Sequence, residues 1–139
     1  MSLIEDIKES EGFRDKVYKD TLGIDTIGYG FAIKDLVLEE DICDIILARK
    51  VEKLVVKVND KFPFLQGIPV DKAEIVIEMC YQMGVTGVSK FKKMIKHLEN
   101  GNFEKASVEM LDSKWAKQTP NRALKLSNRM KQWLIENLH

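Results

Sequence analysis

Apolar residues recur at intervals of three and four along most of this chain, which predicts a largely helical protein. A first helix is predicted over residues 2–12, because Ser2-Leu3-Ile4-Glu5 has the form of a capping box and Gly12 can end a helix. A long helix of about 20 residues is predicted from the acidic run at 39–41 to about Asn59. Three further helices are predicted over residues 73–83, 91–98 and 103–111; Gly84 and Gly87 end the first of them, and the third leads to Trp115. A last helix is predicted from an N-cap at Thr119, with Pro120 at the first helical position, to Leu138, and its apolar positions include Met130, Trp133 and Leu134.

The exception to the helical pattern is the segment from Val17 to Phe31. There short apolar and polar residues alternate and are interrupted by Gly23, Gly28 and Gly30. This pattern predicts a small β-hairpin, with glycines where the backbone turns or approaches a ligand closely. The whole chain is therefore predicted to be α+β and mostly helical.

The composition is that of a soluble globular domain. The chain has 139 residues, of which 45% are hydrophobic and 32% charged, and this length suits a single domain. No apolar stretch approaches the ~20 residues that span a bilayer, and the acid-rich segment 1–11 does not have the form of a signal peptide. Cys43 and Cys80 are expected to be buried free thiols, although one disulfide remains arithmetically possible. His97 and His139 are too few and too scattered for a metal site, so no cofactor is expected.

Three side chains in the N-terminal segment have the chemistry of a glycosidase site: Glu11, Asp20 and Thr26. Glu11 ends the first helix, on the same face as Ile4 and Ile7, while Asp20 and Thr26 fall on the hairpin. Two carboxyl groups that flank a glycosidic bond can donate a proton to the leaving oxygen and activate water. Each residue also has a plainer explanation, since a glutamate at a helix end can turn to solvent and an aspartate commonly forms turns.

The spacing Glu-x8-Asp-x5-Thr, with Tyr18-Lys19-Asp20-Thr21 and Thr26-Ile27-Gly28, resembles that of the phage-type lysozyme family. A second block agrees with this resemblance: Gln82-Met83-Gly84, Thr86-Gly87-Val88 and Gln118-Thr119-Pro120-Asn121-Arg122-Ala123. The resemblance implies one lysozyme domain over 1–139, in which a small hairpin lobe (13–38) is joined by a connecting helix (39–60) to a helical lobe (1–12 and 61–139). The T-even phage lysozyme, the best-known member of this family, carries an insert between Ile33 and the long helix. This chain has almost nothing there, so its small lobe should be reduced to little beyond the hairpin.

The resemblance also implies roles for individual residues. Glu11 is expected to protonate the glycosidic oxygen, Asp20 to act on the opposite face, and Thr26 to hold the attacking water. Arg122 matches an arginine that contacts the catalytic glutamate in the family and is expected to fix its rotamer. Five positions match family residues that contact substrate: Tyr81, Gln82, Ala32, Met94 and Glu109. At the last three, the residue types differ from those of the T-even phage enzyme. Gln82 is also expected to form a hydrogen bond with Trp115.

The implied activity is hydrolysis of the β-1,4 bond between N-acetylmuramic acid and N-acetylglucosamine in peptidoglycan, with inversion, during lysis of the host by a phage or prophage. The protein is expected to be a monomer and to stay in the host cytoplasm until a separate protein permeabilises the membrane. It is then expected to act on the cell wall in the periplasm. Neither stable membrane association nor nucleic-acid binding is expected. A lytic transglycosylase and a wall-binding protein without activity are the alternatives. Asp20 and Thr26 argue against the transglycosylase, which needs only one acid, and intact Glu11, Asp20 and Thr26 together argue against a protein that only binds the wall.

Charge is unevenly distributed although the net charge is zero. Residues 1–60 carry 9 Lys/Arg and 14 Asp/Glu, whereas residues 61–139 carry 13 and 8. A basic half could help to hold the anionic wall polymer. Most of these lysines are nevertheless interpreted as solvated helix faces.

Overall fold

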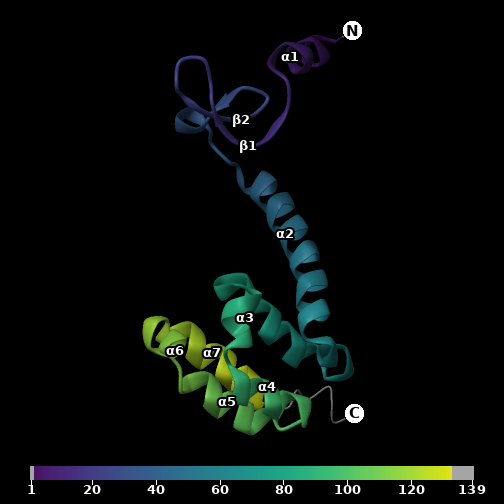
Figure 1. Ribbon diagram of the computed structural model, residues 1–139, viewed down its shortest axis with the longest axis vertical. Coiled ribbons are helices and arrows are strands. Elements are labelled where there is room, and N and C mark those ends of the chain that lie inside the picture. The colour runs from purple at the N-terminus through teal and green to yellow at the C-terminus, as the bar shows by residue number, and fades with distance from the viewer. Residues whose placement is uncertain (1, 133–139) are drawn as a thin grey trace. The chain divides into compact units, whose positions relative to one another are not determined.

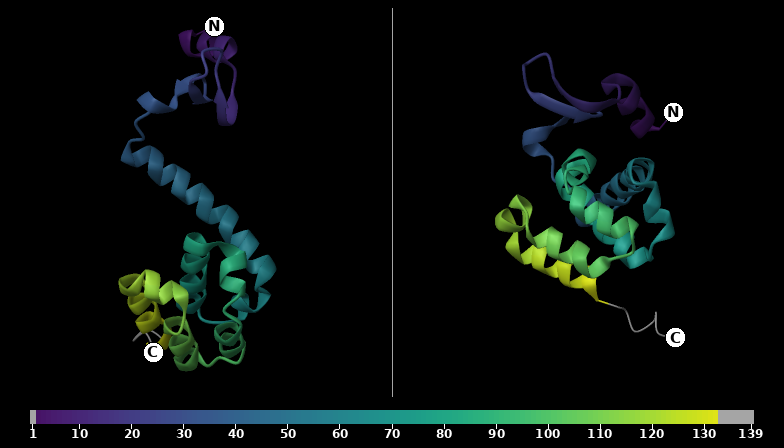
Figure 2. Two further views of the ribbon diagram at one scale, coloured as in Figure 1. Left: turned by 60° about the vertical axis from the view of Figure 1, so that its left-hand side comes forward. Right: turned by 60° about the horizontal axis from the view of Figure 1, so that its bottom comes forward.

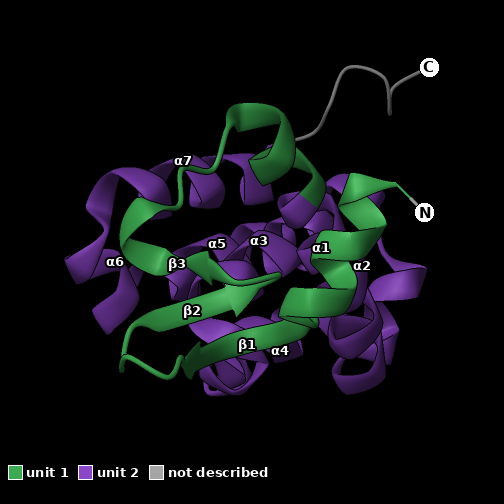
Figure 3. Cartoon of the chain, turned by 90° about the horizontal axis from the view of Figure 1, so that it is seen from above, with its two compact units in different colours: residues 1–45 green, residues 46–139 purple. Residues whose placement is uncertain are grey.

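The computed structural model describes residues 2–132, so the part of the last helix predicted over 133–138 lies outside the described residues (Figure 1). Contacts divide the chain into two compact units, residues 1–45 and residues 46–139 (Figure 3). We call them the first and the second unit and describe each by itself. The predicted assignment of residues 1–12 to the helical lobe stays a prediction.

The first unit opens with α1 (Leu3–Glu11), which begins at the predicted capping box. The Ser2 hydroxyl accepts a hydrogen bond from the Glu5 N–H at 3.2 Å, and the Glu5 carboxylate accepts one from the Ser2 N–H at 3.2 Å. Gly12 follows the helix with φ +71°, a conformation that glycine adopts at low cost. The face of α1 that carries Ile4, Ile7 and Glu11 is exposed, with Ile4 at 67% and Ile7 at 47%, so α1 itself does not surround Glu11 with buried apolar side chains.

A three-stranded antiparallel sheet follows α1, with strand order β1-β2-β3 (Figure 3). The strands are β1 (Arg14–Lys19), β2 (Asp25–Gly28) and β3 (Phe31–Ala32), and the short 3-10 helix η1 (Ile33–Asp35) ends this region. The predicted two-stranded hairpin was therefore incomplete. Gly28 and Gly30, with φ of +69° and +73°, turn the chain so that Phe31 pairs with Ile27 as a third strand.

The long helix α2 (Glu40–Lys61) begins with two acidic residues in its first turn and contains the boundary between the two units. Its observed bounds agree with the predicted 39–59 to within two residues. The 3-10 helix η2 (Pro63–Gly67) follows it. Within the second unit α2 buries Val58 completely.

The rest of the second unit, as far as residue 132, is mainly helical (Figure 2). Its helices are α3 (Val70–Ser89), α4 (Lys92–Glu99), α5 (Phe103–Leu111), α6 (Lys114–Gln118) and α7 (Pro120–Lys131). Figure 2 shows α5 and α7 lying side by side, in agreement with their extensive contacts. The core is a single apolar cluster whose fully buried members include Ile75, Met79, Met94, Leu98, Met110, Leu126 and Met130.

Three local predictions in this region need correction. Gly84 interrupts α3 as expected, with φ +82° and ψ +160°, but Gly87 remains helical. Thr119 does not cap α7 with its side chain, because its hydroxyl donates to the Trp115 carbonyl at 2.9 Å. Both cysteines are free, but only Cys80 is buried, because the part of α2 that carries Cys43 is exposed on all sides.

Among residues 2–132, no helix combines the length and the apolar character needed to cross a membrane. The same residues contain no group of three or more His, Cys, Asp or Glu side chains placed to hold a metal ion.

Candidate active site

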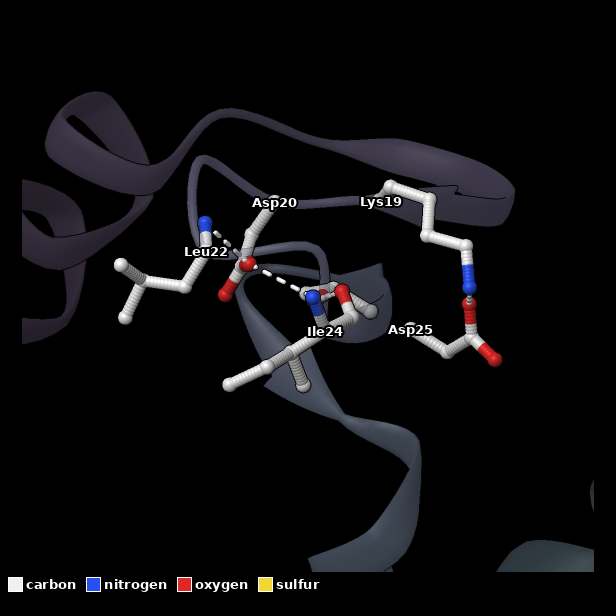
Figure 4. A network of polar contacts seen from close by, with 6 residues as sticks. Lys19, Asp20, Leu22, Ile24 and Asp25 are labelled. Atoms are coloured by element: carbon white, nitrogen blue, oxygen red, sulfur yellow. Dashed lines mark hydrogen bonds and ion pairs between the residues drawn. The ribbon is translucent and has the colours of Figure 1, made fainter.

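Asp20 forms the turn between β1 and β2 with its own carboxylate (Figure 4). Its Oδ1 accepts hydrogen bonds from the N–H groups of Leu22 at 2.8 Å and Ile24 at 2.9 Å. Two backbone bonds close the same turn, from Asp20 N to Ile24 O and from Gly23 N to Asp20 O, each at 3.0 Å. One carboxylate oxygen is thus fixed by the turn, while Oδ2 accepts no hydrogen bond from any residue between 2 and 132. The orientation of Asp20 is therefore set before any ligand binds.

Thr26 lies at the centre of the sheet, on β2, with Tyr18 of β1 on one side and Ala32 of β3 on the other. It is the only side chain of the first unit's described residues that is buried, with 3% exposed. Its hydroxyl donates to the Ile24 carbonyl at 2.8 Å. Because that bond uses the hydroxyl's single hydrogen, Thr26 can only accept a further hydrogen bond. Thr26 is therefore able to accept a hydrogen bond from a water molecule.

The carboxyl group of Glu11 lies against the backbone of Gly30, in the turn between β2 and β3. A Cβ atom placed on Gly30 would lie 2.8 Å from Glu11 Cδ and closer still to its Oε2. In this position of the Glu11 carboxyl group there is no room for a side chain at residue 30, and its φ of +73° also favours glycine. The Asp20 carboxylate is hydrogen-bonded to the N–H of Ile24, just before β2, and the Glu11 carboxyl group contacts Gly30, in the turn just after β2. Thr26 lies on β2, between Ile24 and Gly30.

Aromatic rings surround the turn that receives Glu11. Tyr29, between the two glycines, packs against Phe13 with ring centroids 5.4 Å apart and meets Phe31 edge-on at 6.4 Å. The Lys8 ammonium lies 5.4 Å from the centre of the Tyr29 ring. A sugar ring can pack on such faces while polar groups contact its hydroxyls.

The remaining predicted residues belong to the second unit. The Trp115 indole donates to Gln82 Oε1 at 2.9 Å, which is the bond expected from the family resemblance. Tyr81 follows Cys80 on α3 and is 48% exposed, so it is not a core aromatic residue. Arg122 donates from Nε to Glu78 Oε2 at 3.0 Å, with both side chains 37% exposed. The contact of Arg122 with Glu11 stays a prediction.

A cavity of about 720 Å³ opens beside Trp115 within the second unit. Gln82, Met94 and Glu109, three of the predicted substrate-contacting residues, line it. Met94 is fully buried, whereas Glu109 is half-buried. Tyr81 and Arg122 are not among its lining residues. The second unit therefore gathers three of its five predicted site residues around one cavity.

Sequence reasoning missed two participants. Gly30 was expected at a turn or close approach, but nothing in the sequence identified Glu11 as its neighbour. Glu78 was not singled out, although it pairs with Arg122. Its spacing of one helical turn from Gln82 on α3 is the signal that could have placed it near the site.

A small sheet carrying Asp20 and Thr26, a preceding helix carrying Glu11, and a helical remainder define a lysozyme-like α+β protein. The chain belongs to the phage lysozyme family, which it matches over residues 8–132.

Three relatives illustrate the range of proteins that this chain resembles. It is 31% identical to "Probable T4-type lysozyme 1" of Dictyostelium discoideum over 84% of this chain and 86% of that protein. It is 34% identical to "Endolysin" of Bacillus phage B103, over 80% of this chain and 43% of the endolysin. It is 28% identical to "Pre-baseplate central spike protein Gp5" of Enterobacteria phage T4, over 91% of this chain but only 27% of the spike protein.

Proposed function

We propose that this chain is a muramidase that hydrolyses the β-1,4 bond between N-acetylmuramic acid and N-acetylglucosamine in peptidoglycan, with inversion at the anomeric carbon. Family membership supports a lysozyme-type glycoside hydrolase. The observation that carries the finer proposal is the placement of Asp20 and Thr26 on the backbone of one residue, Ile24, with Glu11 held at the next turn.

In the proposed reaction, Asp20 and Thr26 position the water that attacks the anomeric carbon. The water donates one hydrogen to Thr26 Oγ1, which can only accept, and the other to the free Oδ2 of Asp20. With both hydrogens engaged, a lone pair of the water is left to attack. Asp20 takes the proton as the C–O bond forms, which is the role of the general base in inverting glycosidases.

Glu11 acts as the general acid on the leaving side. It transfers its proton to the glycosidic oxygen as the bond to the anomeric carbon breaks, so the leaving sugar departs as an alcohol. Water must fit between the anomeric carbon and its base, so we expect the two carboxyl groups to lie about 6.5–9.5 Å apart in the working enzyme. Arg122 is proposed to fix the rotamer of Glu11, and Ala32, Tyr81, Gln82, Met94 and Glu109 to contact the sugars.

The biological setting is proposed from the relatives. Like a phage endolysin, the enzyme would act in lysis of a bacterial host. It would remain in the host cytoplasm until a separate membrane-permeabilising protein gives it access to the wall, and it would act as a monomer.

The proposal is tested by comparing Glu11→Gln with Glu9→Gln, since both glutamates are exposed on α1 and the two changes remove the same charge. Turbidity loss of permeabilised Gram-negative cells should fall about 10²- to 10⁴-fold for Glu11→Gln and change little for Glu9→Gln. Equal rates for Glu11→Gln and the unchanged protein would defeat the catalytic role of Glu11.

Asp20→Asn provides a second test, because the amide oxygen can still accept the two turn hydrogen bonds while the base is lost. Its matched control is Asp25→Asn, which removes only an exposed ion pair with Lys19. We expect the first variant to fold normally and lose activity, and the second to remain active. Mass spectrometry of the products should show reducing muramic acid ends, and anhydro ends would identify a transglycosylase instead.

A further inference from the structure

The Tyr29 ring contacts residues that come just before and just after Glu11 in the chain. The Lys8 ammonium, three residues before Glu11 on α1, lies 5.4 Å from the centre of this ring. The Phe13 ring, two residues after Glu11, packs against it with centroids 5.4 Å apart. The residue that follows Tyr29 is Gly30, which the Glu11 carboxyl group contacts. Tyr29 therefore lies between chain segments on both sides of the proposed general acid.

The turn that carries Tyr29 is covered by side chains on both sides of the ring. Gly28 and Gly30 flank Tyr29, each with a positive φ. A Cβ atom on Gly28 would lie 2.7 Å from the nearest carbons of the Phe31 ring, so this ring covers Gly28 as the Glu11 carboxyl group covers Gly30. Tyr29 is half-buried, whereas no residue of α1 is buried. The Tyr29 ring thus has a defined position, to which a side chain of α1 can bind.

Lys8 has a second candidate partner, which is Glu11 itself. Residues three positions apart on a helix are neighbours, and a lysine and a glutamate at this spacing can form an ion pair. The carboxylate three positions before Lys8 belongs to Glu5 and already accepts a hydrogen bond from the Ser2 N–H. Among residues 2–132, Lys8 forms no ion pair and lies over the Tyr29 ring. Because an aromatic face attracts an ammonium, the contact with Tyr29 competes with the ion pair to Glu11.

The partner that Lys8 takes matters for a general acid. An ammonium beside a carboxylate favours the ionised form, and a glutamate that has lost its proton has none to donate. An ion pair between Lys8 and Glu11 would therefore reduce the fraction of enzyme that is ready to protonate the glycosidic oxygen. A Lys8 ammonium held on the Tyr29 ring avoids that ion pair.

We propose that Tyr29 is a positioning residue for Glu11: its ring holds the Lys8 ammonium, which keeps the Glu11 carboxyl group out of an ion pair and able to carry the proton that it donates. This inference rests on the proposed muramidase function and adds a determinant of its pH dependence. Tyr29 acts in this role through Lys8, and Glu11 remains the group that transfers the proton.

Other charged groups can also influence Glu11, and they are the same in every variant compared below. In the first unit they are Asp20 and Arg14, whose guanidinium carbon lies 4.6 Å from the centre of the Tyr18 ring. From the second unit, Arg122 is expected from the family resemblance to contact Glu11. The effects of these groups cancel when the variants are compared with one another.

The pH dependence of kcat on soluble glycan strands tests this role. Tyr29→Leu removes the ring, so Lys8 becomes available to pair with Glu11. On the alkaline limb, where activity falls as Glu11 loses its proton, kcat of Tyr29→Leu should be about 2- to 5-fold below that of the unchanged protein, the factor given by one exposed cation–π contact. At acidic pH, where Glu11 carries its proton in both proteins, the two rates should converge. Loss by the same factor at every pH would mean that leucine only misplaces Glu11, and would overturn the proposal.

A second change in the same chain separates the loss of the ring from the release of the lysine. Lys8→Gln/Tyr29→Leu has no ammonium at residue 8, so it should recover the alkaline rate that Tyr29→Leu loses. Lys16→Gln/Tyr29→Leu is the matched control, because Lys16 is an exposed lysine of β1 and the net charge changes by the same amount. Equal recovery in both double variants, or recovery in neither, would overturn the proposal.

Tyr29→Phe is the conservative variant, since it keeps the ring face and removes only the hydroxyl. It should keep the pH profile of the unchanged protein. A profile like that of Tyr29→Leu would assign the effect to the hydroxyl and overturn the role of the ring.

NMR measures the contact itself without activity, and on the unchanged protein, so this test does not depend on the folding of any variant. Protons held above an aromatic face resonate upfield, so the signals of the Lys8 Cε protons should lie upfield of those of Lys16. Equal shifts of the two lysines would overturn the proposal.

The two proposals fail in different ways. A muramidase whose alkaline limb does not respond to these changes would overturn this inference alone. An upfield-shifted Lys8 signal in a protein that hydrolyses no glycan would defeat the muramidase proposal, and with it this role of a contact that nevertheless exists.

Discussion

Asp20 and Thr26 are held in register by a single residue, because the Asp20 carboxylate accepts from the N–H of Ile24 and the Thr26 hydroxyl donates to its C=O. The two bonds are 2.9 and 2.8 Å long, and Ile24 also closes the turn by accepting from the Asp20 N–H. A shift of either side chain would therefore disturb the other. The pair is preorganised by the turn itself, which is how a site limits the reorganisation needed during reaction.

Replacing Thr26 tests whether its hydroxyl matters as an acceptor for water. Thr26→Val keeps the shape of the side chain and removes the hydroxyl. We expect activity on peptidoglycan to fall at least about 10²-fold, which is the lower end of the contribution of general acid–base catalysis. The Ile24 carbonyl also loses one donor, which should lower the free energy of unfolding by about 1 kcal/mol.

Thr26→Ser is the matched control, because it retains the hydroxyl and loses only a methyl group. It should keep most of the activity. Kinetics with soluble glycan strands, together with urea unfolding, separate the two effects. A fully active Thr26→Val protein would rule out the water-holding role.

Gly30 is predicted to be essential because the Glu11 carboxyl group occupies the space of a side chain there. Gly30→Ala should displace Glu11 and reduce activity strongly, since its Cβ would lie 2.8 Å from Glu11 Cδ. The positive φ should also lower the free energy of unfolding by about 1 kcal/mol.

Gly101→Ala separates these two effects. Gly101, between α4 and α5 of the second unit, has a similar φ of +71°, nothing lies within 4 Å of an added Cβ, and it takes no part in the turn formed by Asp20. Both variants should lose similar stability, measured by urea unfolding, whereas only Gly30→Ala should lose activity. Equal activities would show that Glu11 does not depend on this space.

The features that the sequence predicted correctly depend on short-range interactions. The capping box at Ser2, the turn at Asp20 and the break at Gly84 each involve residues within a few positions of one another. The residue types in these three features nearly determine the local backbone conformation, so the sequence alone was enough to predict them. The long helix α2 was also predicted to within two residues, because its apolar stripe is continuous.

Features that depend on longer separations could not be read from the sequence. Arg122 and Glu78 are 44 residues apart, and their pairing follows from the packing of α7 on α3. The strand β3 has only two residues, too few for a recognisable alternation, and it exists because the preceding turn aligns it. The lysines between Lys90 and Lys114 resembled solvated faces until the fold placed them around one cavity.

Lys72 is predicted to stabilise the end of α7. It is 2% exposed, and its ammonium donates to the carbonyl of Arg129 at 2.6 Å and to that of Gln132, besides pairing with Asp71 at 3.0 Å. The last carbonyls of a helix have no partner within the helix, and a cation there is favourable. Lys72→Met should therefore lower the free energy of unfolding by about 1–3 kcal/mol, because buried acceptors are left unpaired.

The control for this change is Lys125→Met, which removes an exposed lysine from the same helix. It should change stability by no more than about 0.5 kcal/mol. Urea unfolding gives both values from the shift in midpoint at constant slope. Equal destabilisation by the two variants would contradict the capping role of Lys72.

The thiol of Cys80 is predicted to make stability fall at alkaline pH. Burial raises its pKa from the ordinary 9.0 to about 11, and the residue is 2% exposed on α3. Above pH 9 the unfolded chain releases this proton before the folded protein does, so the unfolded state is favoured. The contribution is complete below pH 9 and is lost as the pH rises through about 11, by up to about 3 kcal/mol.

The difference between the unchanged protein and Cys80→Ala isolates this contribution, since all other groups that titrate at alkaline pH are common to both. We expect urea-unfolding free energies of the unchanged protein to fall more steeply between pH 9 and 11 than those of the variant. Parallel curves would show that burial does not raise the pKa of the Cys80 thiol.

Alkylation of Cys80 gives an independent measurement in a Cys43→Ala protein, where Cys80 is the remaining cysteine. The reaction should be slow in the folded protein and fast in denaturant, because the reagent reaches the thiolate only after the core around α3 opens.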